Sequence, residues 1–317
     1  MSKRIEETIF PHILDCAIKM ACASFKTAFT NYIRGHTNMF KVKYWRKNRQ
    51  KKVMEIETQY IYDGIICKNI IGKIPMKACK NNKWIDYTLE TKSAVKLHYD
   101  TKTNQYSLFV PTKFTVPPRD DKLRSPCTSG DPGIRTFITC IGDDRVMKIG
   151  NNIQDQIVYF LKQIDKINAD DKLTNDEKTK RVANKEKRIT NLVDELHWKT
   201  INRLTSMYET IYIGVLNMQS IVSNETSNIS KMTKRVGLKL RHFEFRQRLE
   251  YKCNARRINY VEVNERFTSK TCSNCGAYKA DLGAAKKYNC EGCGKVIDRD
   301  VNGARCILFI NTKLNDV

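Results

Sequence analysis

Four cysteines near the C-terminus constrain this 317-residue chain more than any other feature of its sequence. They form two CxxC pairs, each followed by a glycine: Cys272 with Cys275, and Cys290 with Cys293. Two such pairs can supply the four thiolates of a tetrahedral zinc shell, and the glycines let the backbone turn tightly around the metal. The spacing therefore predicts a structural zinc ribbon over residues 268–297.

The charge balance indicates the kind of partner. Lys and Arg number 57 against 34 Asp and Glu, a net charge of +23, and an excess of this size favours DNA or RNA. No stretch approaches the ~18 apolar residues of a membrane-spanning helix, and the start of the chain lacks the apolar core of a secretory signal. Of twelve cysteines, the eight outside the two pairs are scattered, as is typical of reduced thiols. We therefore expect an intracellular protein that binds nucleic acid and no membrane.

Two basic stretches are candidates for that contact. Seven of the twelve residues over 41–52 are basic and none is acidic, and Tyr44 and Trp45 lie among them. A second stretch over 231–257 is also basic and is predicted to form a helix with one face packed. Cations bind phosphates and aromatic rings stack on bases, although a solvated basic surface is the alternative for both stretches. The candidate contact residues are Lys41, Lys43, Arg46, Lys47, Lys234, Arg235, Arg241 and Arg248.

Hydrophobic periodicity suggests a boundary in the first half of the chain. Residues 8–34 have apolar positions at helical spacing, and short β-like runs over 53–114 predict a small barrel or sheet. The proline-rich and charged segment 115–126 has the composition of a linker. We therefore predict one domain over 1–120 and a second over 127–317.

The second half alternates helical and strand-like segments. We predict a long helical region over 151–209, a buried strand over 210–216 and a further strand over 258–263. One apolar stripe in the helical region is expected to pack: Ile189, Leu192, Val193 and Leu196. Residues 125–130 are small and polar, so their composition predicts a poor strand.

Three motifs resemble the RuvC-type nuclease core of the TnpB proteins, which are transposon-encoded and RNA-guided. They are DPGIRTF at 131–137, TSKTCSNCG at 268–276 and DRDVNGA at 298–304. The chain looks more similar still to Fanzor, the eukaryotic and large-virus branch of that family. The resemblance implies a mixed α/β, RNase H-like core with an inserted zinc ribbon, preceded by a smaller helical and β-barrel-like region.

The same resemblance implies a site of three carboxylates. In such a site the carboxylates hold two magnesium ions, which activate a water and stabilise the leaving oxygen of a phosphodiester. By motif match Asp131 is the first carboxylate and Asp300 is the last. Taken alone, Asp131 would be a turn residue before Pro-Gly, and the other two motifs favour the catalytic role.

The middle carboxylate departs from the TnpB pattern. The position that holds glutamate in TnpB corresponds here to Gly214, and Fanzor proteins look similar, with the glutamate moved closer to the ribbon. Glu265 fits that position because it follows Val261 and Val263 at two-residue steps and so shares their face. Glu262 lies on the opposite face and is the weaker candidate.

The resemblance implies a transposon-associated, RNA-guided, magnesium-dependent DNA endonuclease. Its partners would be a guide RNA and target DNA, and it would act as a monomer with its RNA, in a eukaryotic nucleus or encoded by a large DNA virus. Two alternatives remain open: a catalytically inactive zinc-ribbon protein that binds DNA or RNA, and a resolvase that works without RNA. About 130 residues precede Asp131, so we expect a shorter N-terminal region than the family uses.

Overall fold

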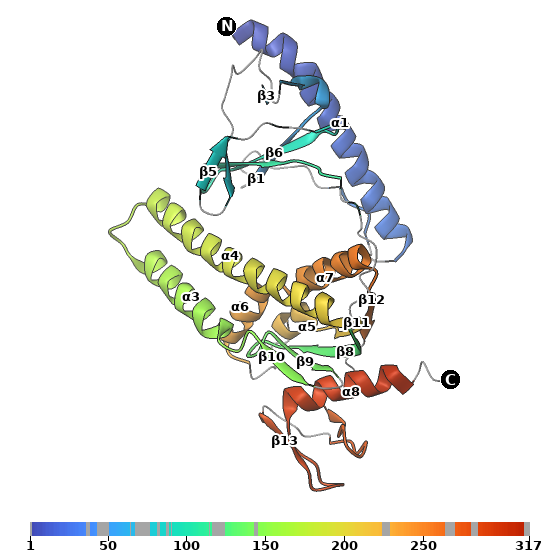
Figure 1. Cartoon of the computed structure of the whole chain (residues 1–317). Coiled ribbons are helices and arrows are strands. Elements are labelled where there is room, and N and C mark those ends of the chain that lie inside the picture. The colour runs from blue at the N-terminus through green and yellow to red at the C-terminus, as the bar shows by residue number, and fades with distance from the viewer. Residues whose placement is uncertain are drawn as a thin grey trace. The chain divides into compact units, whose positions relative to one another are not determined.

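The structure is a computed structural model of the whole chain, which divides into two compact units, Met1–Phe114 and Thr115–Val317 (Figure 1). The residues that it describes are 2–35, 39–42, 51–63, 65–66, 77–80, 83–86, 89, 91–113, 115, 124–142, 145–223, 229–263, 270–279 and 285–313. Among these residues, none of the helices combines the length and the apolar character that crossing a membrane requires.

The N-terminal unit consists of a long helix and short antiparallel strands. Helix α1 (Ser2–Ile33) confirms the helix expected over 8–34. The strands and the one short helix are β1 (Lys51–Ile56), η1 (Thr58–Tyr60), β2 (Ile61–Tyr62), β3 (Ile65–Ile66), β4 (Lys77–Lys80), β5 (Lys83–Asp86), β6 (Val95–Asp100) and β7 (Gln105–Phe109). The described strands form three separate sheets, in the order β1-β6-β7, β2-β3 and β4-β5, so a barrel in this unit remains a prediction.

The C-terminal unit is built on a five-stranded sheet in the order β10-β9-β8-β11-β12. Its strands are β8 (Ser125–Pro132), β9 (Ile138–Gly142), β10 (Val146–Ile149), β11 (Tyr208–Gly214) and β12 (Asn259–Val263). The pairs β8-β9 and β9-β10 are antiparallel, whereas β11 runs parallel to both β8 and β12. The strands predicted over 210–216 and 258–263 are confirmed.

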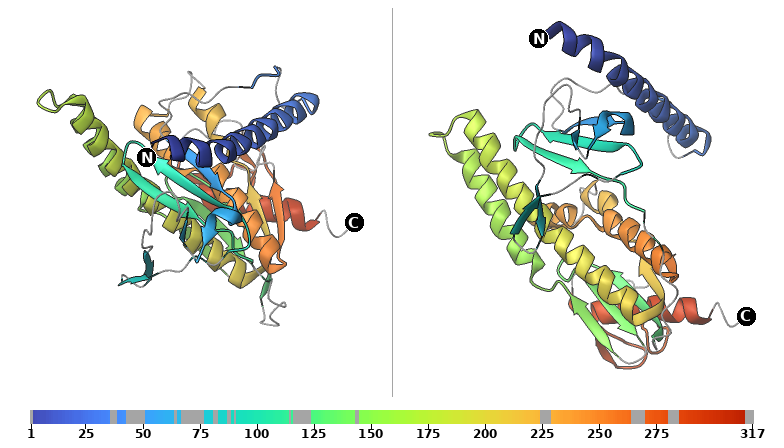
Figure 2. Two further views of the ribbon diagram at one scale, coloured as in Figure 1. Left: turned by 90° about the horizontal axis from the view of Figure 1, so that it is seen from above. Right: turned by 45° about the horizontal axis from the view of Figure 1, so that its top comes forward.

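Helices cover both faces of this sheet (Figures 1 and 2). They are α3 (Ile153–Ala169), α4 (Asn175–Met207), α5 (Met218–Ser223), α6 (Lys231–Leu240), α7 (His242–Arg256) and α8 (Arg299–Lys313). The main core packs α3, α4, α6 and α7 against Ile138, Ile211 and Ile213. A smaller core packs α8 against Ile141 and Tyr212 on the opposite face, as the alternation of side chains along a strand requires. The sheet is therefore buried on both sides.

The central strand β8 corrects the expectation that residues 125–130 form a poor strand. Small residues are needed there because neighbours approach from both faces. The Ser129 hydroxyl donates to the Ala304 carbonyl of α8 over 2.6 Å. A Cβ atom on Gly130 would lie 2.7 Å from the Ile138 side chain, which is closer than real Cβ contacts. The composition of this segment is typical of a loop, but its tertiary contacts stabilise a strand.

The helical region predicted over 151–209 consists of α3 and α4, joined by a short turn. A capping box begins α4: the Thr174 hydroxyl accepts from the Glu177 N–H, and the Glu177 carboxylate accepts from the Thr174 N–H. The predicted apolar stripe is confirmed, since all of its members lie in or against the main core: Ile189, Leu192, Val193 and Leu196.

The prediction of a single helix over 231–257 is wrong, because the helix is interrupted at Arg241, between α6 and α7. This residue has φ 50° and ψ 49°, a left-handed conformation that non-glycine residues seldom adopt. Its guanidinium pairs with Asp194 and Glu244 over 2.7 Å each and donates to the Thr190 carbonyl. These bonds compensate the backbone strain and set α7 against α4.

Two buried histidines sandwich Phe137 at the centre of the main core. The ring of Phe137 stacks on His197 at 5.2 Å and on His242 at 5.0 Å between centroids. The Nε2 atoms of the histidines lie 2.9 and 3.0 Å from the backbone carbonyls of Leu240 and Gly133. A carbonyl only accepts, so Nε2 carries the proton in each ring. Burial lowers the pKa of both histidines to about 4, so both are neutral at pH 7.

These two histidines predict an acid-sensitive fold. Between pH 6.5 and 4 they protonate in the unfolded chain but not in the folded one, so the free energy of unfolding falls as the pH is lowered through this window. Between pH 6.5 and 5.5, where carboxylates scarcely titrate, each histidine should account for a loss of about 1 kcal/mol.

Denaturant titrations of the C-terminal unit's unfolding transition at a series of pH values measure this loss. The His242→Gln variant should show about half the wild-type slope between pH 6.5 and 5.5. A wild-type free energy of unfolding that stays constant over that interval would contradict the prediction.

Candidate active site and metal centre

The four cysteines of the two CxxC pairs converge on one point. The four Sγ atoms all lie within 4.8 Å of one another. The distance is 3.8 Å between Cys272 and Cys293 and 3.5 Å between Cys275 and Cys290. A tetrahedral zinc ion with zinc–sulfur bonds of about 2.3 Å requires sulfur atoms about 3.8 Å apart. The thiols therefore have the separations that a single tetrahedral metal needs.

Each cysteine pair lies on a tight turn closed by its glycine. The Gly276 N–H donates to the Cys272 carbonyl over 2.9 Å, and the Gly294 N–H donates to the Cys290 carbonyl over 3.0 Å. The φ angles of the two glycines are 79° and 68°, in the left-handed region that favours glycine. The sequence expectation for these two positions is confirmed at the level of the backbone.

A backbone N–H group lowers the pKa of one of the four thiols. A hydrogen bond from the Lys295 backbone lowers the pKa of the Cys293 thiol to about 6, so it is largely a thiolate at neutral pH. A thiolate is the form that binds a metal, and four neighbouring thiolates repel each other unless a cation neutralises them.

The ribbon has a small core and a firm attachment to α8. Its second hairpin, β13 (Lys287–Asn289) with β14 (Val296–Asp298), buries Tyr288, whose hydroxyl donates to the Ala277 carbonyl. The fully buried Asn302 of α8 accepts from the Ser273 N–H over 2.8 Å and donates to the Thr271 carbonyl over 2.7 Å. Asn302 therefore holds the first cysteine turn on the helix, a role that sequence reasoning missed although the residue lies within a recognised motif.

Asp131 and Asp300 both lie at the N-terminal part of α8. Asp131 lies at the end of β8, and its Oδ2 atom would be 2.4 Å from a Cβ placed on Gly303. Only glycine permits this approach. Asp300 is in the first turn of α8, three residues before Gly303, and so lies on the same side of the helix. The structure thus brings the first and last predicted carboxylates to one end of one helix.

Asp298, which shares the DRDVNGA motif, has a different task. Its Oδ1 atom accepts from the N–H groups of Asp300 and Val301 over 3.2 Å each, which caps the start of α8. Its other oxygen pairs with Lys148 over 2.6 Å. Partial burial raises the pKa of this carboxyl, but the Lys148 ammonium and the two N–H groups outweigh it and leave the pKa lowered.

The strand register places Gly214 next to Asp131. Ile213 pairs with Gly130, and Gly214 pairs with Val263, so the next row across the sheet contains Asp131, Gly214 and Val263. Val263 is buried against α8, which identifies the face on which this row lies. The position that TnpB fills with glutamate is therefore beside Asp131, and here it carries no side chain.

Of the two candidate glutamates, the structure describes Glu262 and does not describe Glu265. Glu262 points to the α7 face of the sheet, where it accepts from Arg246 Nε over 3.0 Å and from the Tyr260 hydroxyl over 2.8 Å. It therefore points away from Asp131. Glu265 lies outside the described residues, so its role remains a prediction.

Three of the arginines predicted to contact nucleic acid have protein partners. Arg241 and Arg248 both bind Asp194 Oδ1, over 2.7 and 2.6 Å, and both bind Glu244. Arg235 makes a bidentate pair with Asp165, with both distances 2.8 Å. Their positions are explained by packing of α6 and α7, and contact with nucleic acid remains a prediction.

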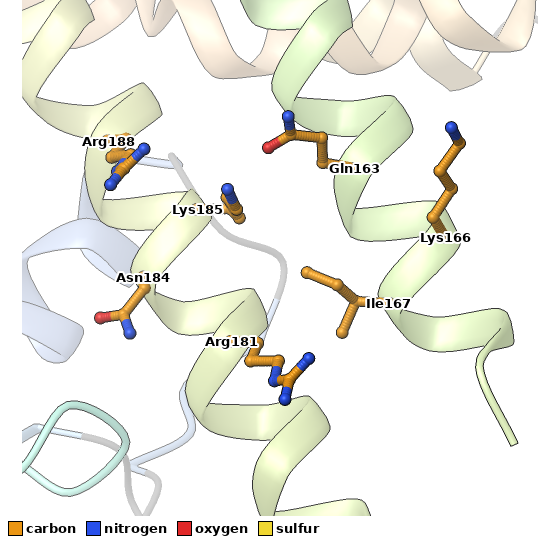
Figure 3. Close-up of a pocket in the computed structure, with 7 residues that line it drawn as sticks. All are labelled: Gln163, Lys166, Ile167, Arg181, Asn184, Lys185 and Arg188. Atoms are coloured by element: carbon orange, nitrogen blue, oxygen red, sulfur yellow. The ribbon is translucent and has the colours of Figure 1, made fainter. Parts of the chain in front are cut away.

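The predicted lysine contacts are less constrained. Lys234 donates to the Val222 carbonyl over 3.4 Å, and Lys41 is exposed. Lys43, Arg46 and Lys47 lie outside the described residues. The structure adds a basic surface that the prediction missed: Arg181, Lys185 and Arg188 lie along one face of α4 (Figure 3). Their signal in the sequence is a run of cations at helical spacing, i, i+4 and i+7.

Comparison with known proteins shows what this chain is similar to. Residues 242–307, which contain α7, β12, the cysteine pairs and the first half of α8, match the sequence profile of the Cas12f1-like TNB domain. A TnpB-like protein of Acanthamoeba polyphaga mimivirus is 36% identical over 318 residues, which is 96% of this chain and 58% of the relative. A second TnpB-like protein of the same virus is 35% identical over 98% of this chain and 59% of the relative.

The chain thus spans somewhat less than three fifths of the length of these relatives. Among solved structures, a cryo-EM structure of a Cas12f1–sgRNA–target DNA complex is similar to it, with a TM-score of 0.44 and 18% identity over 68% of this chain and 45% of that one. The alignments with the two viral relatives cover nearly the whole of this chain. This chain therefore resembles TnpB-like proteins in sequence over nearly its whole length.

Proposed function

We propose that this chain provides the nuclease of a transposon-associated, RNA-guided, metal-dependent system that cuts DNA. The observation that carries the proposal is the approach of Asp131 to Gly303, one turn of α8 away from Asp300. Two carboxylates at one sheet edge repel each other, and divalent cations are the usual reason that such an arrangement is tolerated. The similarity to TnpB-like proteins supports the same chemistry.

The strand order supports a RuvC-type, RNase H-like core for the C-terminal unit. Three consecutive strands, β8, β9 and β10, are antiparallel, and β11 and β12 then extend the sheet parallel to β8 on its other side. The carboxylates of such a core are expected at the carboxyl end of its central strand, where Asp131 lies. On this proposal the domains are 1–120 and 127–317, with the ribbon at 268–297.

Asp131, Asp300 and Glu265 would hold the magnesium ions. Support for Glu265 comes from Val263, the last described residue of β12, which faces α8; the next side chain of the same parity is that of residue 265. Bound magnesium would supply an activated water and stabilise charge on the leaving oxygen. The three carboxylates would bind and position the metal.

A zinc ion held by the four cysteines is the second metal that we propose. The Sγ separations and the left-handed glycines support it, and thiolate-only shells favour zinc. Since Asn302 links the ribbon to α8, the zinc would also steady the helix that carries Asp300.

Guide RNA and target DNA are the proposed partners, with one protein copy bound to its RNA. The net charge of +23 and the TnpB-like relatives support a polyanionic partner. The test is to sequence the RNA that co-purifies with the protein and to offer DNA complementary to it in the presence of magnesium.

Substitution of the carboxylates predicts a selective loss of cleavage. Asp131→Asn, Asp300→Asn and Glu265→Gln should each lower the magnesium-dependent cleavage rate about a hundredfold or more, because a metal ligand worth several kcal/mol in the transition state is removed. Binding of RNA should change little. Cleavage of labelled target DNA and RNA binding, measured on the same preparations, provide the comparison.

Glu262→Gln is the matched control, because it makes the same chemical change at a glutamate of β12 that points to the α7 face. It should cut at the wild-type rate. If the Glu265→Gln variant still cuts and the two aspartate variants do not, the assignment of Glu265 is wrong and the nuclease proposal stands. A wild-type protein that binds RNA without cutting would favour the catalytically inactive binding protein.

Metal analysis tests the zinc site. The purified chain should contain one zinc ion, and Cys290→Ala should lose it and expose the ribbon to proteolysis, because its apolar core is small. Cys253→Ala is the control, since this buried cysteine of α7 belongs to the main core and not to the ribbon. A chain that contains no zinc and still protects its ribbon from protease would refute the assignment.

A further inference from the structure

The first carboxylate of the proposed metal site has a buried hydroxyl directly across the sheet. In the pairing of β8 with β9, Asp131 is opposite Thr139, and in the pairing of β9 with β10, Thr139 is opposite Lys148. Residues paired directly across neighbouring antiparallel strands point to the same face of the sheet, with Cβ atoms about 5 Å apart. The Thr139 hydroxyl is therefore a direct neighbour of the Asp131 carboxylate.

Both side chains point to the face of the sheet that α8 covers. Along β9 the side chains alternate, with Cys140 in the main core and Ile141 packed with α8, so Thr139 shares the face of Ile141. Asp131 points the same way, since its Oδ2 atom lies against Gly303. Thr139 is fully buried on this face.

The Thr139 hydroxyl is a buried donor without an acceptor. Its Oγ1 atom makes no hydrogen bond among the described residues, and it is closed to solvent. No ligand can therefore reach it, and only a neighbouring side chain can accept its hydrogen bond. Of the two residues paired with Thr139, Lys148 has only donors, and its ammonium is bound to Asp298 over 2.6 Å. The carboxylate of Asp131 is the one acceptor of this pair.

Packing does not explain a threonine at this position. Valine has almost the same shape and carries no polar group, so it would fill the space without the cost of burying a hydroxyl that makes no bond. A rotation of the Asp131 side chain changes which of its oxygens faces β9 and requires no movement of the backbone. The hydroxyl is thus placed to bond a second orientation of that carboxylate.

We propose that Thr139 is a positioning residue for Asp131, and that its hydroxyl donates to the carboxylate when the carboxylate binds a divalent cation. One oxygen then accepts from Thr139 and the other faces the cation. Metal-binding carboxylates are in general oriented by such hydrogen bonds. Thr139 itself touches neither metal nor substrate. The inference rests on the proposed function in that Asp131 is taken as a metal ligand.

The test measures two properties of the full chain: thermal unfolding, and binding of Mn²⁺ followed by electron paramagnetic resonance. Oxygen ligands bind Mn²⁺ as they bind Mg²⁺, and the part of the binding that is lost in Asp131→Asn defines the site. Thr139→Val should weaken this binding about tenfold, because a hydrogen bond to a charged group is lost. Its unfolding temperature should equal or exceed that of the wild type, because a buried hydroxyl without a partner is removed.

Thr139→Ser should have the opposite effects. It keeps the hydroxyl, so Mn²⁺ binding should remain within about twofold of the wild type. It loses a buried methyl group, so the unfolding temperature should fall. A residue with a merely structural role would change stability and metal binding together, whereas these two variants should separate them.

Thr128→Val is the matched control. Thr128 is an equally buried threonine of the same sheet, but its hydroxyl donates to the Ile141 carbonyl over 2.9 Å. The substitution removes a hydrogen bond that is already made in the fold. It should therefore lower the unfolding temperature and leave Mn²⁺ binding unchanged.

Four results would overturn the inference. Wild-type Mn²⁺ binding by Thr139→Val would show that the hydroxyl does not act on Asp131. Equal weakening by the valine and serine variants would assign the effect to packing. A lower unfolding temperature for Thr139→Val would show that the hydroxyl already has a structural partner. Unchanged Mn²⁺ binding by Asp131→Asn would refute the metal site and the inference together. Variants that behave as expected in a protein that never cuts DNA would support the inference and refute only the nuclease.

Discussion

The close approach of Asp131 to Gly303 is the contact on which the C-terminal unit depends. A side chain of any size at position 303 would collide with the carboxylate, so α8 can lie across the sheet at this point only through a glycine. The hydrogen bond from Ser129 to the Ala304 carbonyl fixes the same crossing one residue further along the helix. The N-terminal end of a helix favours negative charge, so both the fold and the electrostatics place Asp131 where it lies.

The ribbon and the carboxylates share this helix. Asn302 bonds the backbone of the first cysteine turn, Asp298 caps the helix, and Asp300 stands in its first turn, all within five residues. A change in the ribbon therefore acts directly on the element that presents a carboxylate. This coupling gives a physical reason for the four-cysteine ribbon and the acidic residues to lie close together in the sequence.

The net charge of +23 is distributed unevenly over the described residues. Arg241 and Arg248 both form ion pairs with Asp194 of α4, and these pairs hold α7 against α4. Along one face of α4, Arg181, Lys185 and Arg188 make no ion pair with a carboxylate of the described residues. The two sets look alike in the sequence, yet one stabilises the fold and the other is free to attract a polyanion. Partner geometry, and not composition, separates them.

The amino-acid sequence by itself determined the features that rest on local spacing. The cysteine pairs with their glycines, the apolar stripe of α4 and the DRDVNGA motif depend on residues a few positions apart, so they could be recognised before folding. Tertiary structure alone decided β8, the break at Arg241 and the partners of the arginines. In β8 the residues are small because Ile138 and α8 approach from opposite faces, and at Arg241 a strained backbone is compensated by carboxylates from α4 and α7. Such contacts join segments far apart in the sequence, so no local pattern carries their signature.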